Sequence, residues 1–196
     1  MIHESAIVEE GVILGKGVNV WHFAHVRTGA ELGDYVSIGK DSYVDAKVKV
    51  GRGTRIQNQV SVFSGVSIKE WVFVGPSVVF TNDLFPRVGN KTWKVVETIV
   101  SDGVAIGAGA VIRCGITIGP FAMIGAGALV TKDVPAFTLV LGHPAEGYKH
   151  VCACGQTVKD FGDPSYAPIL QCCYSNMKDE VLEVAKSHIH EALLRK

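Results

Sequence analysis

Hydrophobic residues recur at every sixth position along most of the chain. One run of this pattern extends from Ile2 to Phe80, and a second run, shifted in phase, extends from Val100 to Val130. Four positions after nearly every member stands a small or β-branched residue, and Leu84 is the exception. An amphipathic helix repeats at about 3.6 residues and a strand at about 2, so neither element produces this period.

The period predicts a chain that turns a corner every six residues and directs one aliphatic side chain per face into a thin core. Three faces complete one coil of eighteen residues. We expect an all-β solenoid over residues 1–135, with a loop insertion at 86–99 where the phase is lost. Residues 136–196 form a C-terminal extension with a cysteine-bearing segment and a terminal helix. A loop that leaves a rigid solenoid is expected to lie over a binding surface.

Composition agrees with narrow cores and many tight turns. The chain has 196 residues, of which 47% are hydrophobic, only 8% are aromatic and 22 are glycine. Its 19 basic residues balance 19 acidic ones, so no broad positive field is present to bind nucleic acid or an anionic membrane. No apolar run approaches the length of a membrane span. We therefore expect a soluble protein of the cytoplasm.

The end of the chain reads as an amphipathic helix over residues 176–196, with Asn176 as its N-cap. Its apolar face is expected to pack against the end of the solenoid or a neighbouring subunit. That face consists of Val181, Leu182, Ala185, Ile189, Ala192 and Leu193. His188 and His190 are expected on the solvent side.

Four cysteines in the extension have a spacing that suggests a zinc ribbon, which holds tetrahedral Zn²⁺ by thiolates. They are Cys152, Cys154, Cys172 and Cys173. The usual pair of C-x-x-C motifs is missing, and adjacent cysteines chelate one ion poorly. The sequence therefore leaves two alternatives, a structural zinc site and unliganded thiols.

The eighteen-residue coil places certain polar residues in columns, with a strand spacing of roughly 4.8 Å between coils. Asn82 stands one coil above Ser64 and three above Thr28. His22 lies in another column, below Asn58 on a different corner of the prism. His22 and Asn82 of one chain are then at least about 14 Å apart along the axis.

Three stretches carry a resemblance to a known family: VWHFAHV at 20–26, RIQNQVSVFSGVSI at 55–68 and VFVGPSVVFTNDLFPR at 72–87. The hexad pattern resembles the hexapeptide-repeat proteins, which form left-handed parallel β-helices and assemble as trimers. The three stretches are similar to the N-acetyltransferases that acylate the 3-amino group of nucleotide-linked sugars. The cysteine-bearing extension resembles the branch acting on UDP-2-acetamido-3-amino-2,3-dideoxyglucuronate in bacterial surface polysaccharide (O-antigen) synthesis. The dTDP-3-amino-3,6-dideoxyhexose N-acetyltransferases share the FTND motif and remain the alternative.

The resemblance implies that a neutral sugar amine attacks the thioester of acetyl-CoA directly. Asn82 would aim the amine, and His22 or His25 would act as general base, because imidazole titrates near neutral pH. If neither histidine reaches the amine, the CoA thiolate or water must take the proton. The residues expected to bind the sugar nucleotide are Asp83, Arg87, Asn58 and Ser64.

The same resemblance places acetyl-CoA along the last coils, between two subunits, where small side chains permit close approach. The expected contacts are Ala108, Gly109, Ala126, Gly127, Thr131, Lys132, His143 and Pro144. His143 stands where the family's Gly-Asn-Pro-Ala motif has asparagine, which puts phosphate contacts at that turn in doubt.

Two other classes compete with this interpretation. A non-catalytic hexapeptide scaffold would not need the inserted loop after Asn82. A carbonic anhydrase of the γ type requires three histidines around zinc at a subunit interface. His3, His22 and His25 all lie in the first two coils, without the histidine pair further along the chain that this family shows.

Overall fold

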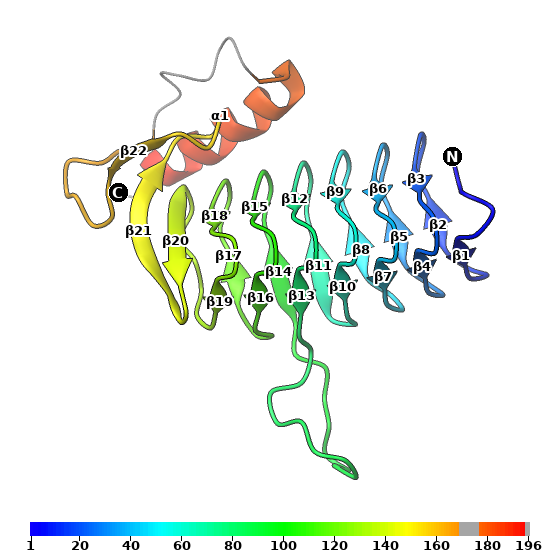
Figure 1. Ribbon diagram of the computed structural model, residues 1–196. Coiled ribbons are helices and arrows are strands. Elements are labelled where there is room, and N and C mark those ends of the chain that lie inside the picture. Colours follow the sequence, from blue (N-terminus) through cyan, green and yellow to red (C-terminus); the bar gives the residue numbers. More distant parts are fainter. Residues whose placement is uncertain (169–176, 195–196) are drawn as a thin grey trace.

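The computed structural model describes residues 1–168 and 177–194, and its main body is a left-handed parallel β-helix of stacked triangular coils (Figure 1). Each coil contributes one short strand to each of three parallel sheets, here called face 1, face 2 and face 3. The register confirms the eighteen-residue coil, since Ile7 pairs with His25 and Val8 with Val26. The predicted fold class is therefore confirmed.

The three faces contain the following strands. Face 1 consists of β1 (Ile7–Val8), β4 (His25–Val26), β7 (Tyr43–Val44), β10 (Ser61–Val62), β13 (Val79–Phe80), β16 (Val111–Ile112) and β19 (Leu129–Val130). Face 2 consists of β2 (Ile13–Leu14), β5 (Glu31–Leu32), β8 (Lys49–Val50), β11 (Val66–Ile68), β14 (Thr98–Val100) and β17 (Thr117–Ile118). Face 3 consists of β3 (Asn19–Val20), β6 (Ser37–Ile38), β9 (Arg55–Ile56), β12 (Phe73–Val74), β15 (Ala105–Ile106), β18 (Met123–Ile124), β20 (Thr138–Gly142), β21 (Ala145–Val151) and β22 (Thr157–Asp160).

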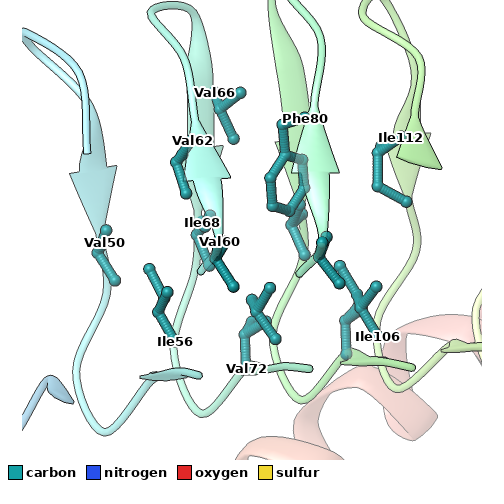
Figure 2. Packing of buried hydrophobic residues seen from close by; sticks show 14 of the residues in the cluster. Val50, Ile56, Val60, Val62, Val66, Ile68, Val72, Phe80, Ile106 and Ile112 are labelled. Atoms are coloured by element: carbon teal, nitrogen blue, oxygen red, sulfur yellow. The ribbon is translucent and has the colours of Figure 1, made fainter. Parts of the chain in front are cut away.

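The core is a single column of aliphatic side chains (Figure 2). In each two-residue strand from β3 onward the second residue points inward and the first points out, which is the alternation expected of a strand. The second hexad position is small or β-branched because three faces converge there, and Ala24, Ala110 and Ala122 are fully buried. Phe80 is the one aromatic side chain among the described residues of this core.

The solenoid is interrupted once, between β13 and β14, where residues 81–97 leave the coil and project well beyond it (Figure 1). Face 2 resumes at Thr98, which pairs with Val66. After β19 the solenoid continues as β20, which pairs in parallel with β18, and then turns into the antiparallel strands β21 and β22.

Helix α1 (Asp179–Leu194) lies along the corner where each coil passes from face 2 to face 3. Its buried residues Leu182 and Ala185 confirm that the predicted apolar face is turned toward the chain, and Ala185 packs with Phe121 and Phe137. Asn176, the predicted N-cap, lies outside the described residues. None of the described helices is long and apolar enough to cross a membrane.

The solvent-side prediction for His188 is wrong. Its Nε2 lies 2.9 Å from Asp102 Oδ2, and its ring meets Phe121 edge-on. His188 is therefore one of the contacts that hold α1 on the solenoid. His190 is exposed, as predicted.

Aromatic rings on this corner pack against glycines of the preceding coil, which gives a stability prediction for Gly53. Its φ is +69°, and an added Cβ would stand 2.3 Å from the Trp71 ring. Gly53→Ala should cost about 1–2 kcal/mol for the left-handed backbone and more for displacing the indole. Gly109→Ala is the matched control, because its φ is +67° with nothing within 4 Å. Equal losses of unfolding free energy in denaturant titrations would contradict the packing account.

Candidate functional site

The outer surface of face 1 changes from mainly polar to apolar along the solenoid. After Ile7 on the first strand, its outward residues toward the N-terminus are His25, Tyr43 and Ser61. Toward the C-terminus they are Val79, Val111 and Leu129, all half-buried. Asn82 stands at the edge of face 1 where these two halves meet, at the point where the loop departs. The site is therefore built around one face with a polar half and an apolar half.

Asn82 continues the register of β13 beyond its paired residues. Val79 pairs with Ser61 and Phe80 with Val62, so Asn82 lies one coil above Ser64, as the column prediction requires. Thr81 Oγ1 accepts a 3.0 Å hydrogen bond from the Cys114 N–H of the next coil, which fixes the start of the loop. Asn82 is half-buried and its side chain makes no hydrogen bond to another described residue. Its amide is free to receive a ligand.

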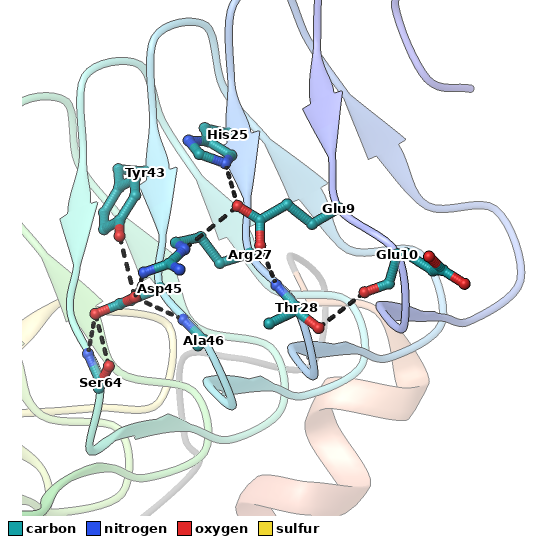
Figure 3. Close-up of polar contacts among 9 residues, drawn as sticks. All are labelled: Glu9, Glu10, His25, Arg27, Thr28, Tyr43, Asp45, Ala46 and Ser64. Atoms are coloured by element: carbon teal, nitrogen blue, oxygen red, sulfur yellow. Dashed lines mark hydrogen bonds and ion pairs between the residues drawn. The ribbon is translucent and has the colours of Figure 1, made fainter.

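The polar half is organised around the buried carboxylate of Asp45 (Figure 3). Asp45 Oδ2 accepts hydrogen bonds from the Ser64 hydroxyl at 2.6 Å and from the Ser64 N–H at 3.1 Å. Its Oδ1 accepts from the Ala46 N–H at 2.7 Å and the Tyr43 hydroxyl at 3.0 Å, with Arg27 at 3.3 Å. Burial alone would raise the pKa of Asp45, but the hydrogen bonds outweigh burial and hold that pKa below its usual value.

Arg27 joins this carboxylate to a second one, Glu9, at 3.3 Å (Figure 3). Glu9 also accepts from the Thr28 N–H at 2.9 Å and lies 2.8 Å from His25 Nε2. The Thr28 N–H, followed by His25, lowers the pKa of the Glu9 carboxyl. The two carboxylates outnumber the single guanidinium of the cluster. The cluster therefore favours a cationic or hydrogen-donating ligand over a phosphate.

The two histidine candidates are not brought to Asn82 within one chain. His25 stands in register with Tyr43, Ser61 and Val79, and so lies about 14 Å below the Asn82 level by three strand spacings. Its ring is engaged by Glu9 and meets Tyr43 edge-on. His22 lies on the corner between faces 3 and 1, where its ring stacks on His3 at 3.4 Å between centroids.

The four substrate candidates fall into two groups. Ser64 lies beside Asp45 and directly below Asn82. Asn58 lies on the His22 corner, where its Oδ1 accepts from the Lys40 N–H at 2.9 Å. Asp83 Oδ1 accepts from the Phe85 N–H at 2.8 Å, so that carboxylate shapes the turn that opens the loop. Arg87 is exposed, and its side chain bonds only to the carbonyl of Pro86 among the described residues.

The cofactor candidates frame the apolar half of face 1. Ala108, Gly109, Ala126 and Gly127 form an exposed strip on one edge, and a Cβ built at either glycine would meet nothing within 4 Å. Thr131 and Lys132 lie on the opposite edge, two coils above Asn82, and Lys132 is 3.6 Å from Glu146.

The turn that contains His143 and Pro144 connects β20 to β21, and both residues are exposed. Lys149, a further basic residue toward the other end of β21, is already paired with Asp160, which raises the pKa of its ammonium group. Together these elements form an apolar surface with one edge free of bulky side chains, a shape that suits an extended thin ligand.

Cys152 and Cys154 lie in the tight turn between β21 and β22, closed by hydrogen bonds from the Cys152 N–H to Gln156 and from the Gly155 N–H to Cys152. Cys172 and Cys173 lie outside the described residues. Among residues 1–168 and 177–194 no group of three or more ligand-type side chains is placed to hold a metal. Zinc binding by the four cysteines stays a prediction, and metal analysis of the purified protein tests it.

Asp45, Arg27 and Glu9 are absent from the candidates that the sequence suggested. The three residues stand eighteen apart in one column, next to the column of Asn82 and Ser64. Opposite charges at that spacing are the signal that would have identified them.

No protein-family model matches the chain. The dTDP-3-amino-3,6-dideoxy-alpha-D-galactopyranose 3-N-acetyltransferase of Aneurinibacillus thermoaerophilus is 39% identical over 158 residues, which cover 81% of this chain and 82% of that protein. The bifunctional protein GlmU of Acidithiobacillus ferrooxidans is 34% identical over 133 residues, but this chain covers only 27% of its length.

Among solved structures, the hexapeptide-repeat-containing acetyltransferase VCA0836 of Vibrio cholerae, complexed with acetyl coenzyme A, aligns with a TM-score of 0.50 and 27% identity. The alignment covers 63% of this chain and 71% of that one.

Proposed function

Because the chain belongs to the hexapeptide-repeat nucleotide-sugar N-acetyltransferases, we propose that it transfers the acetyl group of acetyl-CoA to the 3-amino group of a nucleotide-linked sugar at Asn82. The observation that carries this proposal is the 39% identity over four-fifths of the chain to an enzyme with that reaction. The division of face 1 into a polar and an apolar half, meeting at Asn82, supports it independently.

Acetyl-CoA lies along the apolar half of face 1. Val79, Val111 and Leu129 form a floor for the pantetheine chain, and the Ala108 to Gly127 strip admits it without steric obstruction. Lys132 lies at the rim, where its ammonium can leave Glu146 for a phosphate. The thioester then points down the face toward Asn82.

The sugar approaches from the polar half. Ser64 donates its hydroxyl proton to Asp45, so the hydroxyl oxygen presents only lone pairs outward. Asn82 Oδ1, one coil above, is a second acceptor at a spacing of roughly 4.8 Å. Two acceptors with a buried carboxylate behind them suit a nitrogen that donates hydrogen bonds and becomes positive during attack. Asp45 acts through Ser64 and is a positioning residue.

The chemistry needs a neutral amine. Its lone pair forms the new C–N bond at the thioester carbonyl, the C–S bond breaks, and the CoA thiolate leaves. Holding both reactants on one face supplies much of the rate by removing the entropy cost of their encounter. His25 is engaged by Glu9, and His22 is on another corner. The thiolate therefore takes the amine proton, and free CoA thiol is the product.

Two sugar nucleotides compete as substrate. The extension after residue 147 supports UDP-2-acetamido-3-amino-2,3-dideoxyglucuronate, whose product serves bacterial surface polysaccharide synthesis in the cytoplasm. The relative from Aneurinibacillus thermoaerophilus, which is named for a dTDP-3-amino-3,6-dideoxyhexose, favours the second candidate. A basic cluster that would select the glucuronate carboxylate is not found beside Ser64 among the described residues, where Asp45 dominates instead.

Assembly as a trimer is part of the proposal. The C-terminal coils expose apolar residues on face 1 and on face 3, where Ala105, Met123 and Leu139 point outward. Face 2 is more mixed, since it presents Glu31, Lys49 and Thr117 together with the exposed apolar residues Ile13 and Ile99. Packing face 1 of one subunit against face 3 of the next would bury the apolar strips and leave face 2 in solvent.

One assay tests the function. The protein is incubated with acetyl-CoA and either UDP-linked or dTDP-linked 3-amino sugars, and release of free thiol is followed. Thiol release with one class and little with the other identifies the nucleotide. The matching 3-hydroxy sugars serve as controls, because they lack the nucleophile. Absence of thiol release with both 3-amino classes would refute the proposal.

A further inference from the structure

The corner between faces 2 and 3 carries a column in which glycine alternates with aromatic residues. Tyr35 lies against Gly17, Trp71 against Gly53 and Phe121 against Gly103. Each glycine makes room for the ring of the next coil, since a Cβ there would stand within 2.8 Å of it. The column therefore presents aromatic rings along one edge of the solenoid.

Helix α1 covers only the C-terminal part of this column (Figure 1). Phe121 and Phe137 are 2% and 1% exposed beneath it. The helix begins beside Trp71, where Glu180 pairs with Arg52 at 3.0 Å. Beyond that point Tyr35 remains 47% exposed.

A hollow of about 250 Å³ lies at the N-terminal end of the helix. Its walls include Tyr35, Trp71 and Phe73, together with Arg55 and Lys178. Phe73 and Arg55 are paired neighbours on strands β12 and β9, so both project from face 3. At most other coil corners the glycine faces open space or backbone atoms. At this corner three aromatic rings surround one concave site.

The charge of the hollow is positive. Arg55 is exposed and forms no ion pair with another described residue, and Lys178 Nζ stands 5.9 Å from the Trp71 ring centroid. Arg52 also lies over that ring, at 5.4 Å, but Glu180 neutralises it. None of the described residues that line the hollow is acidic. The side chains of Arg55 and Lys178 are thus available to bind an anion.

We propose that this aromatic hollow binds a nucleotide, with the base against the Trp71 and Phe73 rings and a phosphate between Arg55 and Lys178. A flat base stacks on aromatic faces irrespective of its identity, and guanidinium and ammonium groups recognise phosphate oxygens. The hollow admits one base and not a whole sugar nucleotide, so the rest of the ligand extends outward. The choice of ligands rests on the proposed function, whose two substrates both carry a nucleotide.

Titration of tryptophan fluorescence in the full chain tests the proposal and distinguishes the two sources. UDP and dTDP represent the sugar nucleotide, and adenosine 3′,5′-bisphosphate represents the end of CoA. We expect saturable quenching by at least one of them. Trp71→Phe should abolish the quenching while calorimetric affinity stays within a few-fold, because an aromatic face remains. The other tryptophans do not line the hollow: Trp21 lies on the corner between faces 3 and 1, and Trp93 lies in the loop between β13 and β14.

The cation contacts are tested by Arg55→Ala with Lys178→Ala, which should weaken nucleotide binding at least about tenfold. Lys16→Ala is the matched control, since Lys16 lies on the same corner outside the hollow and should leave affinity unchanged. No saturable quenching by any of the three ligands, or unchanged affinity in the double variant, would overturn the proposal. Nucleotide binding without thiol release would instead refute the acetyl transfer and leave this site standing.

Discussion

Replacing Asn82 with alanine should lower the turnover of acetyl transfer by about a hundredfold, because misplacing a nucleophile by one ångström costs roughly that factor. Asn82 makes no side-chain hydrogen bond to another described residue, so the loss should fall on the reaction and not on stability. Michaelis–Menten kinetics with the preferred 3-amino sugar measure it. A fall in kcat with KM nearly unchanged is expected if the amide acts mainly on the attacking amine.

His22→Ala is the comparison that decides the mechanism. Its ring stacks on His3 on another corner, so its loss should change turnover less than about threefold within the thiolate mechanism. The attacking amine must be neutral whether a histidine or the thiolate takes its proton. The pH–rate profiles of His22→Ala and Asn82→Ala should therefore both keep the limb that reports deprotonation of the amine. If His22→Ala loses more turnover than Asn82→Ala, a histidine base supplied by a neighbouring subunit replaces the positioning mechanism.

The fold was predictable from sequence because its repeat is enforced at every coil. A side chain at a hexad position has one direction available, so Val20, Ile38 and Ile56 had to lie above one another. The column of Asn82 and Ser64 follows from the same arithmetic and needs no side-chain detail. The placement of α1 does not follow from it, because a helix can lie on any apolar edge. His188 was misplaced for that reason, since its partner Asp102 belongs to a distant coil.

The polar cluster shows the other limit of sequence reasoning. Glu9, Arg27 and Asp45 share one column, and their alternating charges were visible in the sequence. What the sequence does not show is that Asp45 is 8% exposed and accepts from Ser64 through both its hydroxyl and its N–H. This fixes the hydrogen-bond polarity of Ser64, a residue predicted to bind substrate: its hydroxyl donates to Asp45 and can only accept from a ligand. That polarity depends on Asp45 remaining ionised.

Asp45→Asn should have the largest effect on stability of any polar substitution in the site. It removes a buried charge and turns an amide N–H₂ toward donors at Ser64, Ala46 and Tyr43, while Arg27 loses one of two partners. Leaving buried hydrogen-bonding groups without partners costs about 1–3 kcal/mol, and more where a charged group is involved. Urea unfolding at fixed protein concentration measures it. Asp133→Asn is the matched control, because Asp133 is exposed, accepts one 2.8 Å bond from the Thr117 N–H and should lose less than about 1 kcal/mol.

The same variant carries a pH signature with a definite sign. The folded-state pKa of Asp45 lies below the unfolded value of about 3.9, so its contribution is present above that pH and is lost as pH falls through the folded-state pKa. Wild-type stability should therefore fall more steeply with acid below about pH 4 than the stability of Asp45→Asn, which has no carboxyl to protonate. Parallel acid limbs for the two proteins would mean that folding does not lower the pKa of Asp45, so that its hydrogen bonds with Ser64, Ala46 and Tyr43 do not favour the charged form. Ser64 would then no longer be held as an acceptor, and the orientation of the amine would have to come from Asn82 alone.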